Sequence, residues 1–208
     1  METVRYSVTE ERLNVITHAI GVIFGAVATG FMLLKTNSLE SRIAVLTFGI
    51  SLILLYTAST LYHLATKPEQ RVKLRIFDHA AIYVLIAGTY TPVCMITLSD
   101  SIGFTLLIII WSVAICGVTL KLFFTGRFDR LSTIMYIAMG WIALFAIKPL
   151  LSAMNTDGLL WMLYGGIFYT IGAGLYSIRS IPFNHAIFHV CVLGGSICHF
   201  IMVYFHVL

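Results

Sequence analysis

Residues 43–64 read IAVLTFGISLILLYTASTLYHL, a run of 22 residues that contains no aspartate, glutamate, lysine or arginine. A helix of about 20 apolar residues is long enough to cross the roughly 30 Å hydrocarbon core of a bilayer. The run is also longer than most core helices of soluble domains. It therefore predicts a transmembrane helix. Two polar residues, Ser59 and His63, lie four residues apart near its C-terminal end.

Six further apolar blocks of similar length flank this run, and the connections between them are short. The chain is 59% hydrophobic and only 11% charged, whereas soluble domains are about 25% charged. The pattern predicts an all-α integral membrane protein. We expect one seven-helix transmembrane domain over residues 1–208, preceded by a short cytoplasmic segment of about residues 1–12. The predicted spans are 13–34, 43–64, 77–98, 102–122, 131–151, 159–178 and 184–206.

The basic residues are distributed unevenly between the two sides of these spans. Ten lie in the N-terminal segment and the second, fourth and sixth loops, and three lie on the other side. Lysine and arginine in short loops stay in the cytoplasm, which predicts a cytoplasmic N-terminus and an extracytoplasmic C-terminus. The basic face indicates membrane lipids as partners, and not nucleic acid. The ten are Arg5, Arg12, Lys67, Arg71, Lys73, Arg75, Lys121, Arg127, Arg130 and Arg179; the three are Lys35, Arg42 and Lys148.

Polar residues within the spans gather at one level, the predicted cytoplasmic end. Such groups are costly in hydrocarbon and usually mark functional sites. The first span opens with Ser7 and Glu10 in a predicted capping box, and its next polar residues share one helical face. Four spans contribute to this level. Their residues are Glu11, Asn14 and His18 in the first span, Ser59 and His63 in the second, Asp78 in the third, and His185 and His189 in the seventh.

The histidines in this set suggest a metal site. His185 and His189 are four residues apart, so both imidazoles project from one helix face and can reach one ion. His63 would complete a set of three, and three histidines with one open position are typical of catalytic zinc. Asp78 could deprotonate a water molecule at the metal or orient a ligand imidazole. Iron or manganese remains an alternative to zinc.

Each residue also has a simpler explanation. The histidines could be interfacial side chains, and Asp78 could pair with Arg75 or stabilise the start of its helix. Glu11 and Asn14 could serve only the first helix terminus, and Ser59 could bond to its own helix. We place His18 behind the ligands and not among them. We exclude three other histidines, His79, His199 and His206, because of their direction or depth.

Five motifs, in order along nearly the whole chain, resemble the hemolysin III branch of the PAQR family, which includes the progestin and adiponectin receptors. They are Glu11-x-x-Asn14-x-x-x-His18, Ser59-x-x-x-His63, Asp78 after a basic stretch, Gly88-Thr89-Tyr90-Thr91-Pro92, and His185-x-x-x-His189. The resemblance implies a multi-pass protein of the bacterial cell membrane with one zinc ion near its cytoplasmic face. It implies His63, His185 and His189 as ligands, Asp78 as the residue that holds the water, and Ser59 as a polar partner.

Three functions fit this pattern. The first is zinc-dependent hydrolysis of a lipid-like amide or ester, as in the alkaline ceramidases of the wider superfamily, with substrate entering from the bilayer or the cytoplasm. The second is a non-enzymatic sensor or regulator of the membrane in which zinc is structural. The third is a pore-forming cytolysin, against which the absence of a secretion signal argues. The sequence favours the hydrolase but leaves open whether the protein is an enzyme, and it indicates no oligomeric state.

Overall fold

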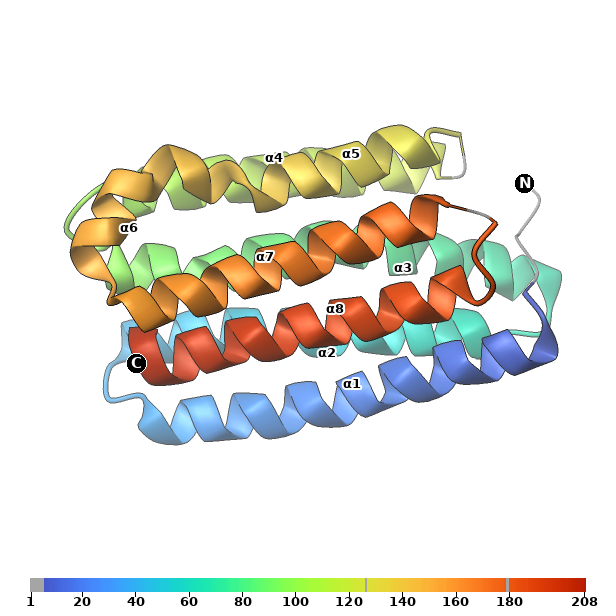
Figure 1. The fold of residues 1–208 in the computed structure, drawn as a ribbon, viewed down its shortest axis with the longest axis horizontal. Helices are drawn as coiled ribbons and strands as arrows, with labels where there is room; N and C mark the ends of the chain where they lie inside the picture. The colour runs from blue at the N-terminus through green and yellow to red at the C-terminus, as the bar shows by residue number, and fades with distance from the viewer. Residues whose placement is uncertain (1–5, 126, 179) are drawn as a thin grey trace.

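The computed structural model describes residues 6–125, 127–178 and 180–208, so Arg5 and Arg179 lie outside the described residues. The described chain folds into a bundle of seven helical spans, and its two termini lie at opposite ends (Figure 1). The all-α membrane fold predicted from the apolar blocks is confirmed. The helices are α1 (Val8–Lys35), α2 (Leu39–Leu64), α3 (Pro68–Pro92), α4 (Gly103–Phe124), α5 (Asp129–Gly140), α6 (Ile147–Ala153), α7 (Thr156–Ser177) and α8 (Asn184–Met202).

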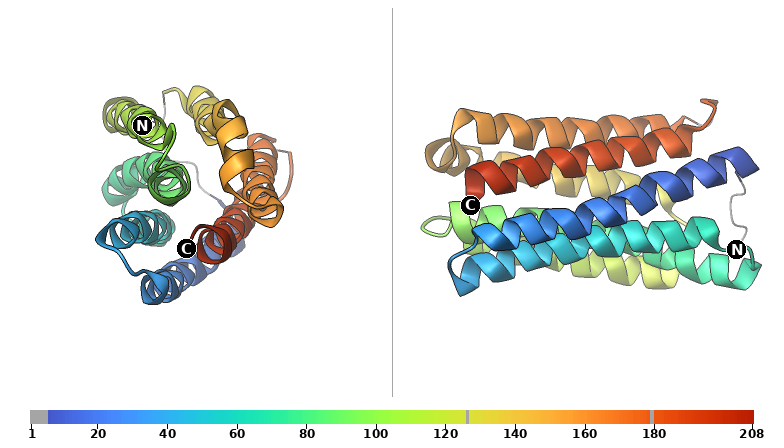
Figure 2. Two further views of the ribbon diagram at one scale, coloured as in Figure 1. Left: turned by 90° about the vertical axis from the view of Figure 1, so that its left-hand side faces the viewer. Right: turned by 90° about the horizontal axis from the view of Figure 1, so that it is seen from below.

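Neighbours in sequence are mostly neighbours in space. The helix α1 packs against α2 and α8, α2 also packs against α3, and α7 packs against α8. Seen end-on, the spans are arranged around a common centre (Figure 2). We call the end at which α1, α3, α5 and α8 begin the site end; it is on the right in Figure 1. The C-terminus lies at the opposite end.

Five helices, α1, α2, α3, α5 and α7, begin before the corresponding apolar blocks, and the difference is largest for α3. The helix α3 starts at Pro68 and not at residue 77, because proline is well suited to the first helical position, where its missing N–H costs nothing. Arg71, Lys73 and Arg75, which we had placed in a loop, are therefore helical. The helix α1 starts at Val8, where Ser7 accepts a hydrogen bond from the Glu10 backbone N–H. The helix cap predicted at Ser7 is confirmed. Among the described contacts, the reciprocal bond from the Glu10 side chain, predicted as a capping box, does not form.

The fifth span is broken where the sequence predicted one continuous helix. α5 ends at Gly140, a short 3₁₀ segment covers Ile142–Ala146, and α6 follows. The Tyr90 hydroxyl of α3 donates to the Gly140 carbonyl at 2.7 Å and accepts from the Ala143 N–H at 2.9 Å. These bonds satisfy backbone groups that the break exposes within the bilayer. Pro92, predicted to kink the third span, instead ends α3 and is followed by a π-helical turn at Val93–Thr97.

Close packing between α7 and α8 depends on glycine. A Cβ atom added to Gly165 would lie 2.3 Å from the His199 ring, and one added to Gly195 would lie 2.8 Å from the Tyr169 ring. Small residues at such positions let transmembrane helices approach closely. The packing role predicted for the glycine-rich segments is confirmed.

Candidate metal centre

Three buried histidines meet at the site end. His63 lies in the last turn of α2, whereas His185 and His189 lie in the first turns of α8. One ring nitrogen of each lies within 4.8 Å of the other two. The three side chains are between 1% and 5% exposed. We call this group the histidine triad, and it is the set that the sequence predicted as ligands.

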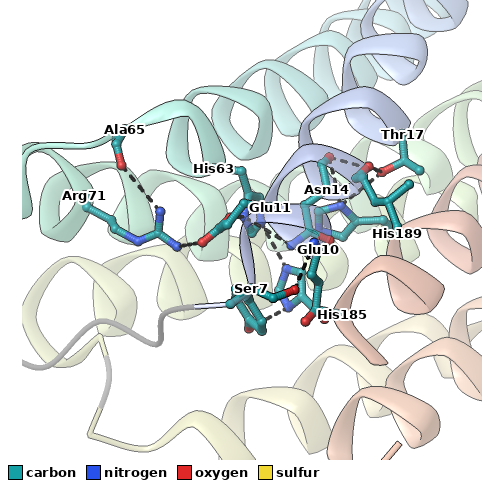
Figure 3. Close-up of polar contacts among 12 residues, drawn as sticks. Ser7, Glu10, Glu11, Asn14, Thr17, His63, Ala65, Arg71, His185 and His189 are labelled. Carbon is teal, nitrogen blue, oxygen red and sulfur yellow. Dashed lines mark hydrogen bonds and ion pairs between the residues drawn. The ribbon is translucent and has the colours of Figure 1, made fainter. Parts of the chain in front are cut away.

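Each imidazole of the triad has its Nδ1 atom next to an oxygen (Figure 3). His63 Nδ1 is 2.7 Å from the Glu11 carboxylate, His185 Nδ1 is 2.9 Å from the Tyr6 hydroxyl, and His189 Nδ1 is 3.3 Å from the Asn14 carbonyl. An Nδ1–H that donates to such an oxygen leaves the Nε2 lone pair free. Metal-binding histidines in proteins are held in this way.

The Nε2 atoms of His63 and His185 lie 3.1 Å apart. Two lone pairs at this distance repel each other unless a cation lies between or beside them. Ligands placed 2.0–2.1 Å from a tetrahedral zinc ion are separated by about 3.3–3.4 Å. The triad therefore has the donor chemistry of a metal site, and the spacing of His63 and His185 is close to that of two ligands of one ion.

Glu11 connects the triad to the basic stretch of α3. One carboxylate oxygen faces His63, and the other pairs with the Arg71 guanidinium (Figure 3). Arg71 also lies over the Tyr62 ring, 4.7 Å from its centre. The Glu11 side chain is 20% exposed, and an ion pair open to solvent adds little to stability. Its main effect is therefore to hold the carboxylate beside His63.

The inner face of α1 supports His189. The Asn14 carbonyl and the Thr17 hydroxyl, 3.3 Å and 3.4 Å away, both face His189 Nδ1. His18 stacks on the same ring, with centres 3.5 Å apart and planes within 11°. Asn14 also places its side-chain amide 3.4 Å from His63 Nδ1. The residues predicted to lie behind the ligands, Glu11, Asn14 and His18, all contact the triad.

Asp78 and Ser59 lie beside the triad and not within it. Asp78 is 7% exposed, and its electrostatic neighbours are His63, Ser59 and Arg75. The neighbourhood of Asp78 and Arg75 was one of the alternatives left open by the sequence. Asp78 is therefore a buried carboxylate next to the triad.

A cavity of about 470 Å³ extends from the triad into the bundle. At the site end it is lined by Ser59, Asp78, His185 and His189. Farther along the bundle its walls are mostly aliphatic and aromatic, and the lining reaches Leu150 and Met202. The chamber is thus polar at one end and apolar along its length.

The other histidines do not join the triad. His199 Nε2 is 3.2 Å from the Met162 carbonyl of α7, and its ring packs beside Gly165. His79 lines the cavity but belongs to the face of α3 next to Asp78, and His206 lies at the opposite end of the bundle. All three were excluded as ligands from the sequence.

Sequence reasoning missed three residues that contact the site: Tyr6, Thr17 and Arg71. Arg71 could have been placed on a helix, since Pro68 is a strong signal for a helix start. Thr17 lies one turn from Asn14 on the same face. Tyr6 precedes α1, where helical periodicity carries no information.

Comparison with known proteins identifies the family of the chain. The Haemolysin-III related family profile matches residues 6–200. The chain is 43% identical over 204 residues to the hemolysin-3 homolog of Bacillus subtilis (strain 168), covering 97% of this chain and 96% of the relative. It is 45% identical over 204 residues to hemolysin-3 of Bacillus cereus, covering 97% and 93%. Human monocyte to macrophage differentiation factor is 24% identical over 204 residues, covering 94% and 84%. The chain therefore belongs to the Haemolysin-III related family and is a multi-pass bacterial membrane protein.

Proposed function

We propose that this protein is a zinc-dependent hydrolase that cleaves an amide or ester bond in a lipid-like substrate. One observation carries the proposal: the histidine triad and Asp78 lie at the polar end of a long apolar cavity. Metal ligands, a buried carboxylate and a binding chamber for an acyl chain thus share one space. A site that served only to hold helices together would need neither the carboxylate nor the chamber.

Three neutral imidazoles suit zinc, and His63, His185 and His189 would hold it with one position left for substrate or water. Bound there, zinc would polarise the carbonyl of the substrate and make water more acidic. Glu11, Tyr6 and Asn14 keep the three rings in the tautomer that ligation requires. The chain therefore supplies a preorganised set of ligands.

Asp78 is the general base in this proposal. It takes a proton from water as the water oxygen bonds to the carbonyl carbon of the substrate. It returns that proton to the leaving nitrogen or oxygen when the bond to carbon breaks. The Ser59 hydroxyl, which has no hydrogen-bond partner among the described contacts, lies in the same cavity as Asp78 and would serve as its polar partner. The apolar walls bind the acyl chain and exclude other water.

We place this site near the cytoplasmic face of the membrane. In the described chain, the site end carries Arg12 of α1, the basic stretch Lys67–Arg75, and Lys121 and Arg127. Lys35, Arg42 and Lys148 lie at the opposite end. This asymmetry supports a cytoplasmic N-terminus, and the polar headgroup of a substrate would then lie at the inner leaflet.

The test is Asp78→Asn in detergent-purified full-length protein, supplied with a panel of N-acyl amides and fatty acyl esters. Loss of the base should lower turnover by about 10²–10⁴-fold, while the bound zinc measured by mass spectrometry is kept. Asp100→Asn, at an exposed position of the opposite end, is the matched control and should keep full turnover. Equal turnover in wild type and Asp78→Asn would contradict the role of Asp78.

A structural role for the metal is the second candidate, because the triad joins two helices, His63 from α2 and the other two ligands from α8. Wild-type protein that holds zinc but hydrolyses none of these lipids would favour it over the hydrolase. In that case the protein would sense or regulate the state of the membrane.

A further inference from the structure

Tyr6 lies across the site end although it precedes the first helix. Its hydroxyl is 2.9 Å from His185 Nδ1. Its ring centre is 4.7 Å from that of His185 and 6.0 Å from that of His63. Residues 6 and 185 are far apart in sequence, so this contact ties the start of the chain to the last helix.

The start of α1 sets this position. Ser7 accepts a hydrogen bond from the Glu10 N–H at 3.2 Å, and its carbonyl accepts one from the Glu11 N–H at 2.9 Å. The cap fixes the point at which the chain leaves the helix axis. Tyr6, immediately before the cap, is thereby directed over the triad and not away from the bundle.

Tyr6 completes a pattern in which one short segment contacts every ligand. Within residues 6–14, Tyr6 faces His185, Glu11 faces His63, and the Asn14 carbonyl faces His189. Glu11 and Asn14 were expected from their helical face, whereas Tyr6 adds the contact to the third ring.

We propose that Tyr6 is a positioning residue for the metal site. Its oxygen accepts the His185 Nδ1–H and so directs Nε2 toward His63 and His189, while its ring covers the triad on the side of the N-terminal segment. The inference rests on the metal site of the proposed function. It assigns to Tyr6 two separable effects, since the hydroxyl sets affinity and the ring slows exchange of the ion with solution.

The hydroxyl and the ring can be tested separately. Tyr6→Phe keeps the ring but removes the hydrogen-bond acceptor, and Tyr6→Ala removes both. Loss of a residue that orients a metal ligand typically weakens metal binding by about 10–100-fold. We expect that loss for Tyr6→Phe, and for Tyr6→Ala the same loss together with faster release of the ion.

The experiment uses the full chain in detergent, loaded with zinc. Zinc affinity is measured by competition with a chelator, and release is measured after addition of excess chelator. The cobalt-loaded forms are compared by visible absorption, because a rotated His185 changes the ligand field. Tyr164→Phe, at a half-exposed position of α7, is the control and should behave as wild type. The melting temperatures of metal-free wild type, Tyr6→Phe and Tyr164→Phe should be equal.

Three results would overturn the inference. Tyr6→Phe with wild-type affinity and an unchanged cobalt spectrum would show that the hydroxyl positions nothing. A fall in affinity accompanied by an equal fall in metal-free stability would assign Tyr6 to packing. Wild-type protein without measurable zinc affinity would overturn both this inference and the metal site. None of these measurements is of turnover. If Asp78 is not the general base, the results expected for Tyr6 stay the same.

Discussion

The two halves of α8 carry histidines that are almost equally buried but differ in their surroundings. His185 and His189 are 5% and 1% exposed, and His199 is 8% exposed. The first two face His63 and are backed by oxygens from the start of the chain. His199 instead contacts a carbonyl of α7 and packs on a glycine. Burial alone therefore does not identify a ligand.

Depth in the bundle accounts for this difference. His199 is 14 residues beyond His185, which places it on a similar face of the helix but about 21 Å farther along the axis. At that level His199 meets the Met162 carbonyl and the Tyr169 ring of α7. The same type of side chain thus belongs to the candidate metal centre at one level and packs between helices at another.

The largest change in metal affinity is expected for Glu11→Gln in α1, whose side chain contacts the triad at the first half of α8. The substitution removes the charge beside His63 and the ion pair with Arg71 while keeping the shape of the side chain. Metal affinity should fall by about 10–100-fold, because a carboxylate partner raises the basicity of a ligand imidazole. Chelator competition measures the change.

Glu10→Gln is the neighbouring control and should bind zinc as the wild type does. Its carboxylate makes no described contact with the triad. Equal affinities for Glu11→Gln and wild type would mean that the charge of Glu11 contributes nothing to the site.

The smallest effect on stability is expected for a variant in the second half of α8. His199→Leu removes the hydrogen bond to the Met162 carbonyl and replaces the ring with a side chain of similar volume. Thermal unfolding should show a loss of about 1 kcal/mol, the usual worth of one such bond. Zinc affinity should not change, and a loss of zinc in this variant would erase the distinction between the two halves.

The sequence predicted all three triad histidines and most of the residues that contact them, because both follow from helical spacing and from the number of spans. His185 and His189 share a face at i and i+4, and the alternation of spans brings His63 to the same end of the bundle. The part that was missed depends on where helices begin. Arg71 reaches Glu11 only because α3 starts at Pro68.

Other features depend on packing that no local pattern reveals. Tyr6 precedes the first helix, so its contact with His185 follows from tertiary structure alone. The break after Gly140 is stabilised by Tyr90 from a different helix. An apolar block of the right length is compatible with one continuous helix or with two shorter ones, so composition could not separate them.

The most direct test is the metal content of detergent-purified protein equilibrated with trace zinc, measured by mass spectrometry for wild type, His189→Ala and His199→Leu. The triad predicts about one zinc ion per chain in wild type and in His199→Leu. It predicts almost none in His189→Ala. Wild type without zinc, or His189→Ala with as much zinc as wild type, would contradict a metal centre at the histidine triad.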